Sequence, residues 1–267
     1  MRNHCRPLFE FPQRRYPSPM DSDAYLNAIE RECADFTVAL GSGAERDVPS
    51  CPGWRLADLA VHLGVIHRWS AEMVRSRASE PLRNREQLFG VDPDDPELIK
   101  WFEQGASELV KVLRSSPADT PVWTWTPERS VRFWTRRQAH EAAVHRWDAQ
   151  NALLAGPPQA IDAALAADGI DEWLSVFAVS RSRRTSEPIG LGESFHFHCT
   201  DEQGEWVIRF EGSDIEVRSE HAKADVAVRG TASDLLLFLW GRRSHETLEV
   251  LGNASLLERW AEFLPAI

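Results

Sequence analysis

The hydrophobic pattern of this 267-residue chain changes its period once, near residue 180, and that change constrains the fold more than any other feature. Before this point, apolar residues recur at three- and four-residue intervals, which is the pattern of amphipathic helices. Beyond it, apolar and polar residues alternate, which is the pattern of strands that bury one face. The sequence therefore predicts a helical domain over residues 20–180, a boundary within residues 180–192, and a small α+β domain over residues 192–267.

Glycine, proline and polar stretches divide the first region into four long helices and a possible fifth helix. These segments are residues 21–40, 55–77, 96–116, 135–156 and 159–180. The polar, proline-rich residues 81–96 are predicted to be a loop. Four long helices with crossing connections are typical of a four-helix bundle, a fold that builds metal sites from side chains on facing helices.

The second region begins with a predicted β-hairpin. Residues 194–200 and 205–212 alternate at period two, and the turn residues DEQG separate them. Two more strands, a short helix, a fifth strand and a terminal helix are predicted at residues 214–220, 224–230, 233–243, 248–252 and 254–264. Ser233 is the predicted N-cap of the short helix.

The composition argues against several kinds of partner and compartment. A net charge of −11 and a pI near 5.3 disfavour nucleic acid and anionic membranes, because both attract clustered Lys and Arg. No apolar run approaches the ~20 residues of a membrane span. Four scattered cysteines without a C-x-x-C pair predict reduced thiols and a cytoplasmic protein. Residues 1–19 lack the apolar segment of a signal peptide and are predicted to be a disordered extension.

The stretch HEAAVH, residues 140–145, places Glu141 and His145 one helical turn apart. Ligands at i and i+4 can bind one ion, as in the zinc-binding helix signature H-E-x-x-H. A zinc site with an open coordination position needs a third protein ligand. His62 is the best candidate because the helix around it is otherwise apolar, and His67, which points to another side, is the second choice. Spacing alone does not exclude two alternatives, namely that Glu141 and His145 form a surface ion pair and that His62 is a core histidine.

Three polar residues near this pair each have two interpretations. His140 is rotated about 100° from Glu141 and is predicted to pack or to lie on the surface. Asp148 follows His145 by three residues, so it could orient the imidazole or be a solvated helix residue. Arg137 precedes Glu141 by four residues and could pair with it or bind an anionic substrate.

Two further patterns invite a functional interpretation. Nothing near Cys51 in the sequence would lower its thiol pKa, so a small apolar loop residue is preferred over a nucleophile. In FHFHC, His196 and His198 would share one face of a strand and Cys199 would lie on the other face. A joint metal site with the cysteine is therefore not expected, and a solvent-facing stripe is predicted.

The chain resembles the mycothiol-dependent maleylpyruvate isomerase family in four segments, namely VPSCPGWRLADLAVHLG, RRQAHEAAVHRWDAQ, AADGIDEWL and ADVAVRGTASDLLLFLWGRR. The resemblance covers about residues 20–264. It implies a DinB-like four-helix bundle that holds a divalent metal, typically zinc, followed by a small α+β domain. The metal ligands that it implies are His62, Glu141 and His145.

The resemblance also implies thiol chemistry on a small electrophile. The protein would use mycothiol, either as a cis–trans isomerase of the maleylpyruvate type or as a thiol S-transferase. A coordinating thiol is deprotonated by zinc, which gives a thiolate near neutral pH. An arginine from the C-terminal domain would bind a substrate carboxylate. Arg242 in LWGRR is the best match, with Arg243 and Arg229 as alternatives.

Two functions of other classes remain open at this point. A binding or regulatory module with the same fold would use the apolar stretch DLLLFLWG to hold a ligand or a partner. A metal hydrolase that needs no thiol would use Glu141 as a general base instead of a ligand.

Overall fold

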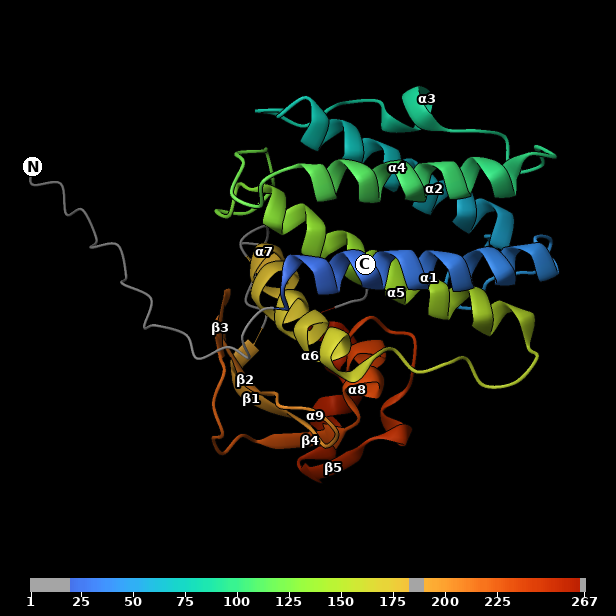
Figure 1. The fold of residues 1–267 in the computed structure, drawn as a ribbon. Coiled ribbons are helices and arrows are strands. Elements are labelled where there is room, and N and C mark those ends of the chain that lie inside the picture. Colours follow the sequence, from blue (N-terminus) through green and yellow to red (C-terminus); the bar gives the residue numbers. More distant parts are fainter. Residues whose placement is uncertain (1–19, 183–189, 265–267) are drawn as a thin grey trace, which may run out of the picture.

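The computed structural model describes residues 20–182 and 190–264, in which a layer of helices lies above a region that contains one β-sheet (Figure 1). The predicted fold class, a helical bundle followed by an α+β region, is confirmed. The predicted extension at residues 1–19 lies outside the described residues. Within the described ranges, no helix is both long and apolar enough to cross a membrane.

Four long helices form the bundle, and they are α1 (Ser22–Gly43), α2 (Leu56–Arg75), α4 (Leu98–Ser115) and α5 (Val131–Leu153). The main packing contacts follow the cyclic order α1, α5, α2, α4. In Figure 1, α1 and α4 face the viewer, and α2 and α5 lie behind them. The bundle therefore has one face formed by α1 and α4 and an opposite face formed by α2 and α5.

Short side chains fix where the helices begin. Asp21 is the N-cap of α1, and its Oδ1 accepts a hydrogen bond from the backbone N–H of Ala24 at 2.7 Å. At the start of α2, Oδ2 of Asp58 accepts from the backbone N–H of Arg55 at 2.8 Å, which is one half of a capping box. These bonds set the phase of each helix and hence which residues face the core.

Three differences from the predicted elements concern the presence, start or continuity of a helix. The predicted loop at 81–96 contains the short helix α3 (Arg85–Phe89), which buries no residue and so has no hydrophobic signal in the sequence. Helix α5 begins at Val131, before the predicted start. The terminal helix is interrupted into α9 (Ala254–Glu258) and α10 (Trp260–Phe263).

A helical segment leads from the bundle to the sheet, at the position of the possible fifth helix. It comprises α6 (Ala163–Glu172), the π-helix η1 (Trp173–Ala178) and α7 (Val179–Ser182). Helix α6 packs on α8 (Ala232–Leu239) more extensively than on α5. This segment is therefore the contact layer between the bundle and the sheet region.

The sheet has five strands, which are β1 (Gly190–Cys199), β2 (Glu205–Gly212), β3 (Asp214–Arg218), β4 (Val226–Gly230) and β5 (Glu249–Gly252). Their order across the sheet is β3-β2-β1-β4-β5. Strands β1 and β2 form the predicted hairpin, and β1 pairs with β4 in parallel. One face of β1 is apolar. On this face the rings of Phe195 and Phe197 pack against Trp260, with centroid distances of 5.0 Å and 5.3 Å.

The prediction that Ser233 caps α8 is wrong. Thr231 is the N-cap, and its Oγ1 accepts from the backbone N–H of Asp234 at 3.1 Å. Ser233 instead accepts a hydrogen bond at 3.0 Å from the backbone N–H of Ile161, just before α6. Its hydroxyl thus ties α8 to the helical segment that leads from the bundle.

The close approach of α2 and α4 makes Gly64 sensitive to substitution. A Cβ atom there would lie 2.3 Å from the ring of Trp101, and Arg68 covers the same ring at 3.9 Å from its centroid. Because the ring would have to shift to make room for the methyl group, we expect Gly64→Ala to lower the free energy of unfolding by about 1–3 kcal/mol. Urea unfolding of the purified chain measures this change.

Gly41→Ala in α1 is the matched control. The nearest heavy atom outside the helix backbone to its Cβ would be Cδ1 of Ile99 at 3.8 Å, an ordinary contact. Alanine favours the helix, so this variant is expected to keep or raise the stability, by at most about 1 kcal/mol. Equal stability of the two variants would contradict the close packing at Gly64.

Candidate metal centre

The three predicted ligands meet between α2 and α5. His62 comes from α2, and Glu141 and His145 come from successive turns of α5. One ligand atom of each lies within 4.8 Å of the other two. Oε1 of Glu141 is 3.7 Å from Nε2 of His62 and 3.4 Å from Nε2 of His145. The packing of two helices thus gathers two imidazole nitrogens around one carboxylate oxygen.

Arg137 holds the Glu141 carboxylate in this orientation. Its Nη2 donates to Oε2 of Glu141 at 2.6 Å, so Oε1 is the oxygen that faces the histidines. Burial raises the pKa of Glu141, but Arg137 and the two histidines lower it, and the net result lies well below the usual value. The carboxylate is therefore ionised at neutral pH, as a metal ligand must be.

Asp148 orients the second imidazole. Its Oδ2 lies 3.0 Å from Nδ1 of His145, so Nε2 is the nitrogen directed at Glu141. Burial lowers the pKa of His145, but the hydrogen bonds to Asp148 and Glu141 raise it to about 9 overall. Asp148 itself is fully buried, so it is an orienting residue and not a solvated one.

Arg242 reaches α5 from the turn after α8. Its Nε and Nη2 donate to the two carboxylate oxygens of Asp148 at 3.2 Å and 3.1 Å, and its Nη1 donates to the backbone oxygen of Trp240 at 2.8 Å. The two alternatives, Arg243 and Arg229, pair with carboxylates of their own region instead. Of the three arginines, Arg242 is the one that contacts the residue orienting the second imidazole.

Two other histidines of the helical region do not join the cluster. His67 is fully buried beside Phe102, with ring centroids 5.6 Å apart, and burial lowers its pKa to about 3. It is a neutral core histidine. His140 is also buried, with its ring nitrogens 2.9 Å from Glu172 and from Asp168 on α6. Its role is packing and ion pairing between helices.

Cys51 and the FHFHC stretch lie outside the cluster of His62, Glu141 and His145. Burial and the nearby Asp148 raise the pKa of the half-buried Cys51, which supports the interpretation of this residue as structural. Cys199 is buried. The solvent-facing stripe predicted for FHFHC is wrong for His196, which is only 6% exposed, because the ring of His221 packs against it at 5.2 Å.

The surroundings of Arg137 were not visible in the sequence. Glu172 on α6 pairs with this arginine, and the rings of Phe177 and Trp240 lie 5.1 Å and 5.6 Å from its guanidinium carbon. These residues come from three separate elements, and no spacing rule connects them. They account for Arg137 being an internal partner of Glu141 rather than a free anion-binding group.

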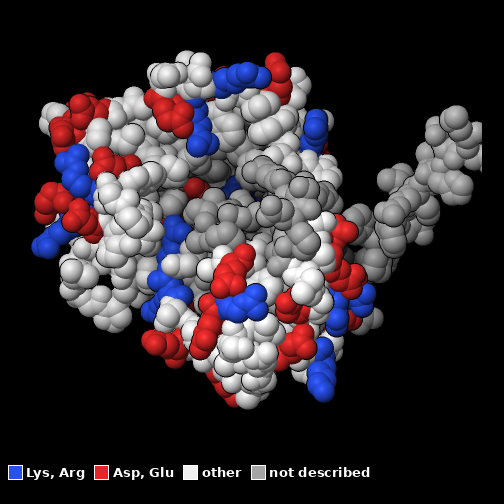
Figure 2. Space-filling view, turned by 180° about the vertical axis from the view of Figure 1, so that it is seen from behind, with Lys and Arg blue, Asp and Glu red and all other residues white. Residues whose placement is uncertain are grey.

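The cluster opens on the face formed by α2 and α5. His62 is the most exposed of the three side chains, at 30%. Figure 2, the view from behind, shows a hollow near the middle of this side, with acidic and basic side chains visible inside it. The partial exposure of His62 makes it the ligand of the cluster that is most open to solvent.

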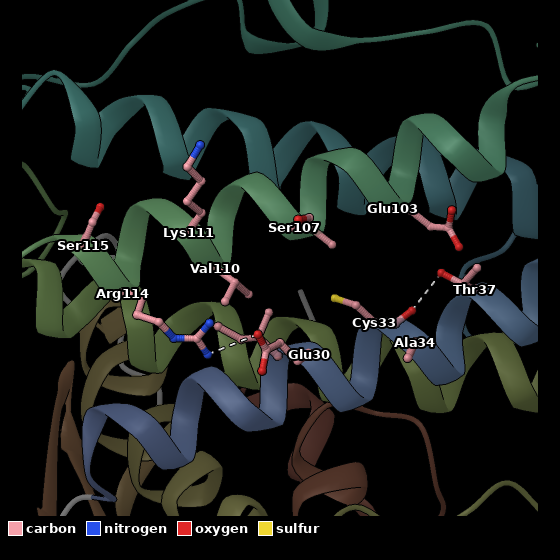
Figure 3. Close-up of a pocket in the computed structure, with 12 residues that line it drawn as sticks. Glu30, Cys33, Ala34, Thr37, Glu103, Ser107, Val110, Lys111, Arg114 and Ser115 are labelled. Atoms are coloured by element: carbon pink, nitrogen blue, oxygen red, sulfur yellow. Dashed lines mark hydrogen bonds and ion pairs between the residues drawn. The ribbon is translucent and has the colours of Figure 1, made fainter.

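A separate groove lies on the opposite face, between α1 and α4 (Figure 3). Glu30 and Arg114 form an ion pair of 3.1 Å across it, and Cys33 and Ser107 lie along its length. None of the three cluster residues lines this groove. Its shape is that of a seam between two helices, and the candidate chemistry lies on the other side of the bundle.

Together the fold and the cluster define a DinB-like helical-bundle protein with an appended α+β domain. Two family models match the chain, the mycothiol maleylpyruvate isomerase N-terminal domain over residues 26–150 and the C-terminal domain of the same family over residues 164–259. The chain therefore belongs to the mycothiol-dependent maleylpyruvate isomerase family, as the sequence resemblance indicated. The second match begins within α6, earlier than the predicted boundary at 180–192.

Solved structures support the same fold. The chain is similar to crystal structures of the mycothiol-dependent maleylpyruvate isomerase and of a point mutant of that enzyme, each with a TM-score of 0.61 and 13% sequence identity. Each match covers 86% of this chain and 93% of the other. No curated protein matches this chain. At this level of identity the likeness shows a shared fold.

The buried pair between Arg242 and Asp148 joins the two regions, with side chains 8% and 0% exposed. We expect Arg242→Ala to lower the free energy of unfolding by about 3 kcal/mol, because it removes the arginine partner of a fully buried carboxylate. Arg243→Ala is the control, since its pair with Asp234 is partly exposed, and its expected loss is below about 1 kcal/mol. Chemical unfolding measures the free energy of unfolding of both variants. An equally small loss in both would show that the buried pair adds no more stability than the partly exposed one.

Proposed function

We propose that this protein is a divalent-metal-dependent enzyme, with zinc as the expected ion, that uses mycothiol as cosubstrate on a small electrophile. The reaction is a cis–trans isomerisation of the maleylpyruvate type or a thiol S-transfer. The observation that carries the metal is the convergence of His62, Glu141 and His145. Membership of a family with a solved mycothiol-dependent maleylpyruvate isomerase supports the thiol and the isomerase.

The donor set fits a divalent ion of the zinc class. Two imidazole nitrogens and one carboxylate oxygen are the ligands of many catalytic zinc sites, which keep a further position for water or substrate. Glu141 is ionised, and Nδ1 of His145 is engaged by Asp148, which leaves Nε2 for the ion. When bound, such an ion would supply a thiolate near neutral pH, because it lowers the pKa of a coordinating thiol.

The residues of this chain would position the reactants. In the isomerase reaction a thiolate adds reversibly to an activated cis double bond, rotation follows, and elimination of the thiol gives the trans isomer. Arg242 uses three N–H groups on Asp148 and Trp240. A guanidinium has five such groups, so two remain without a partner among the described residues and can bind a substrate carboxylate.

Two observations weigh against the other candidate functions. A hydrolase would need Glu141 as a proton acceptor, but its pKa is held well below the usual value, which makes it a weak base. The binding module was suggested by the apolar DLLLFLWG stretch. Its residues Leu235 to Leu239 are all buried in the described structure, so they offer no free apolar surface.

The first test is the metal content of the purified, tag-free chain. We expect His145→Ala to bind one equivalent of zinc less than the wild type and to lose thiol-dependent turnover of the electrophile. His245→Ala, which removes a histidine that belongs to neither group of potential metal ligands, is the control and should keep both. Elemental mass spectrometry gives the stoichiometry, and an unchanged zinc content in His145→Ala would refute the assignment.

The affinity of this site for zinc should rise with pH. In the metal-free protein the pKa of His145 is raised to about 9, so the imidazole carries a proton at pH 7 and must lose it to bind metal. We expect an increase of about tenfold per pH unit between pH 6 and 9, levelling off above this range. The measurement compares the wild type with His145→Ala at each pH, and it gives the affinity of the zinc ion that only the wild type binds. An affinity independent of pH would contradict the proposed role of His145.

A further inference from the structure

A second group of potential metal ligands lies on the sheet. His196 and His198 alternate along β1, so their side chains share one face of the sheet. Glu205, the first residue of β2, is the register partner of His198 across the hairpin. His221 comes from the loop between β3 and β4. Strand pairing and one loop thus bring three imidazoles and a carboxylate together.

The distances between these groups suit one ion. Oε1 of Glu205 is 2.7 Å from Nδ1 of His198, and its Oε2 is 2.7 Å from Nδ1 of His221 and 3.5 Å from Nε2 of His196. One ligand atom from each of the four residues lies within 4.8 Å of all the others. Zinc bonds of ~2.0–2.2 Å in a tetrahedron place ligand atoms about 3.3 Å apart, which is close to the separations of 2.7 Å and 3.5 Å between the Glu205 oxygens and the imidazole nitrogens.

The buried histidine supplies an independent sign of a missing ligand. The side chain of His196 is only 7% exposed, and its Nε2 has no hydrogen-bond partner among the described residues. Buried polar atoms are nearly always satisfied, so an unsatisfied one calls for an explanation such as an ion. The nitrogen faces the Glu205 carboxylate and the ring of His221. A metal ion at this point would give Nε2 its missing partner.

We propose that His196, His198, Glu205 and His221 bind a divalent transition-metal ion of the zinc class, as a site separate from the candidate centre of the bundle. Four protein ligands leave no open coordination position, which is typical of structural sites. The ion would fasten the loop that carries His221 to the hairpin of β1 and β2. This site shares no residue with His62, Glu141 and His145, and its existence does not depend on the proposed function.

The alternative is a hydrogen-bonded cluster without metal, in which Glu205 simply accepts from His198 and His221. Zinc binding distinguishes the two. The experiment uses the full, tag-free chain freed of metal by a chelator and titrated with zinc against a chromophoric indicator. The variants are His145→Ala, which removes a ligand of the bundle centre, and His221→Ala, which removes the most exposed ligand of the sheet site, at 80% exposure. Because of this exposure, His221→Ala is expected to fold normally.

The proposal expects His145→Ala to retain one tightly bound zinc. Adding His221→Ala to that variant should weaken the remaining zinc at least tenfold, and adding His198→Ala should do the same. Adding His245→Ala, a histidine outside both clusters, should leave the remaining zinc unchanged. Glu205→Gln tests the carboxylate separately, since the amide keeps the shape but is a poorer ligand.

The proposal is overturned if His145→Ala binds no zinc, or if its zinc is unaffected by both His221→Ala and His198→Ala. The proposed function fails in a different way. In that case zinc is lost only in the sheet-site variants, while His145→Ala keeps the zinc content of the wild type. The two assignments are therefore tested by different variants of the same titration.

Discussion

The burial of many charges on α5 is the constraint on which the rest of the structure depends. A charge removed from water needs a partner close by, because an unpaired buried charge strongly destabilises the fold. For three residues of α5 the carboxylates come from helix α6, and the pairs are Arg136 with Asp168 and Asp171, Arg137 with Glu172, and His140 with Asp168 and Glu172. A single placement of α6 along α5 forms all of these ion pairs. The same placement carries α8, and with it Arg242, to the bundle.

Charge pairing also prepares the candidate metal centre. Arg137 occupies one oxygen of Glu141 and so directs the other oxygen at the two imidazoles. Arg242 and His145 share Asp148, which fixes the second imidazole from behind. The two arginines reduce the attraction of the site for a dication, but they keep the carboxylates of Glu141 and Asp148 ionised, so protons do not compete for these oxygens at neutral pH. Ligands held in place in this way lose little entropy when an ion binds.

The sequence predicted contacts between residues that lie close together along the chain, and it missed contacts that depend on how distant segments pack. Glu141 and His145 are one helical turn apart, so local geometry sufficed to pair them, and the apolar surroundings of His62 marked it as the candidate third ligand. Residues that meet through register or loops gave no such signal. Glu205 contacts His198 through the pairing of β1 with β2, and the position of His221 depends on the path of a loop. The cap of α8 was misplaced because two hydroxyl residues compete there, and tertiary contact with Ile161 decides between them.

The number of protein ligands separates the two proposed sites by function, although their chemistry is the same. In the bundle, two histidines and one glutamate would leave one position free on a tetrahedral ion, and the partly exposed His62 lies on the side that is open to solvent. On the sheet, three histidines and one glutamate would complete a tetrahedron, so that an ion there has no place for a reactant. If both sites hold an ion, a thiol sulfur would bind at the free position in the bundle, and the ion on the sheet would only hold the sheet and its loop together. Catalysis is expected at the bundle centre alone, whichever ion occupies the other.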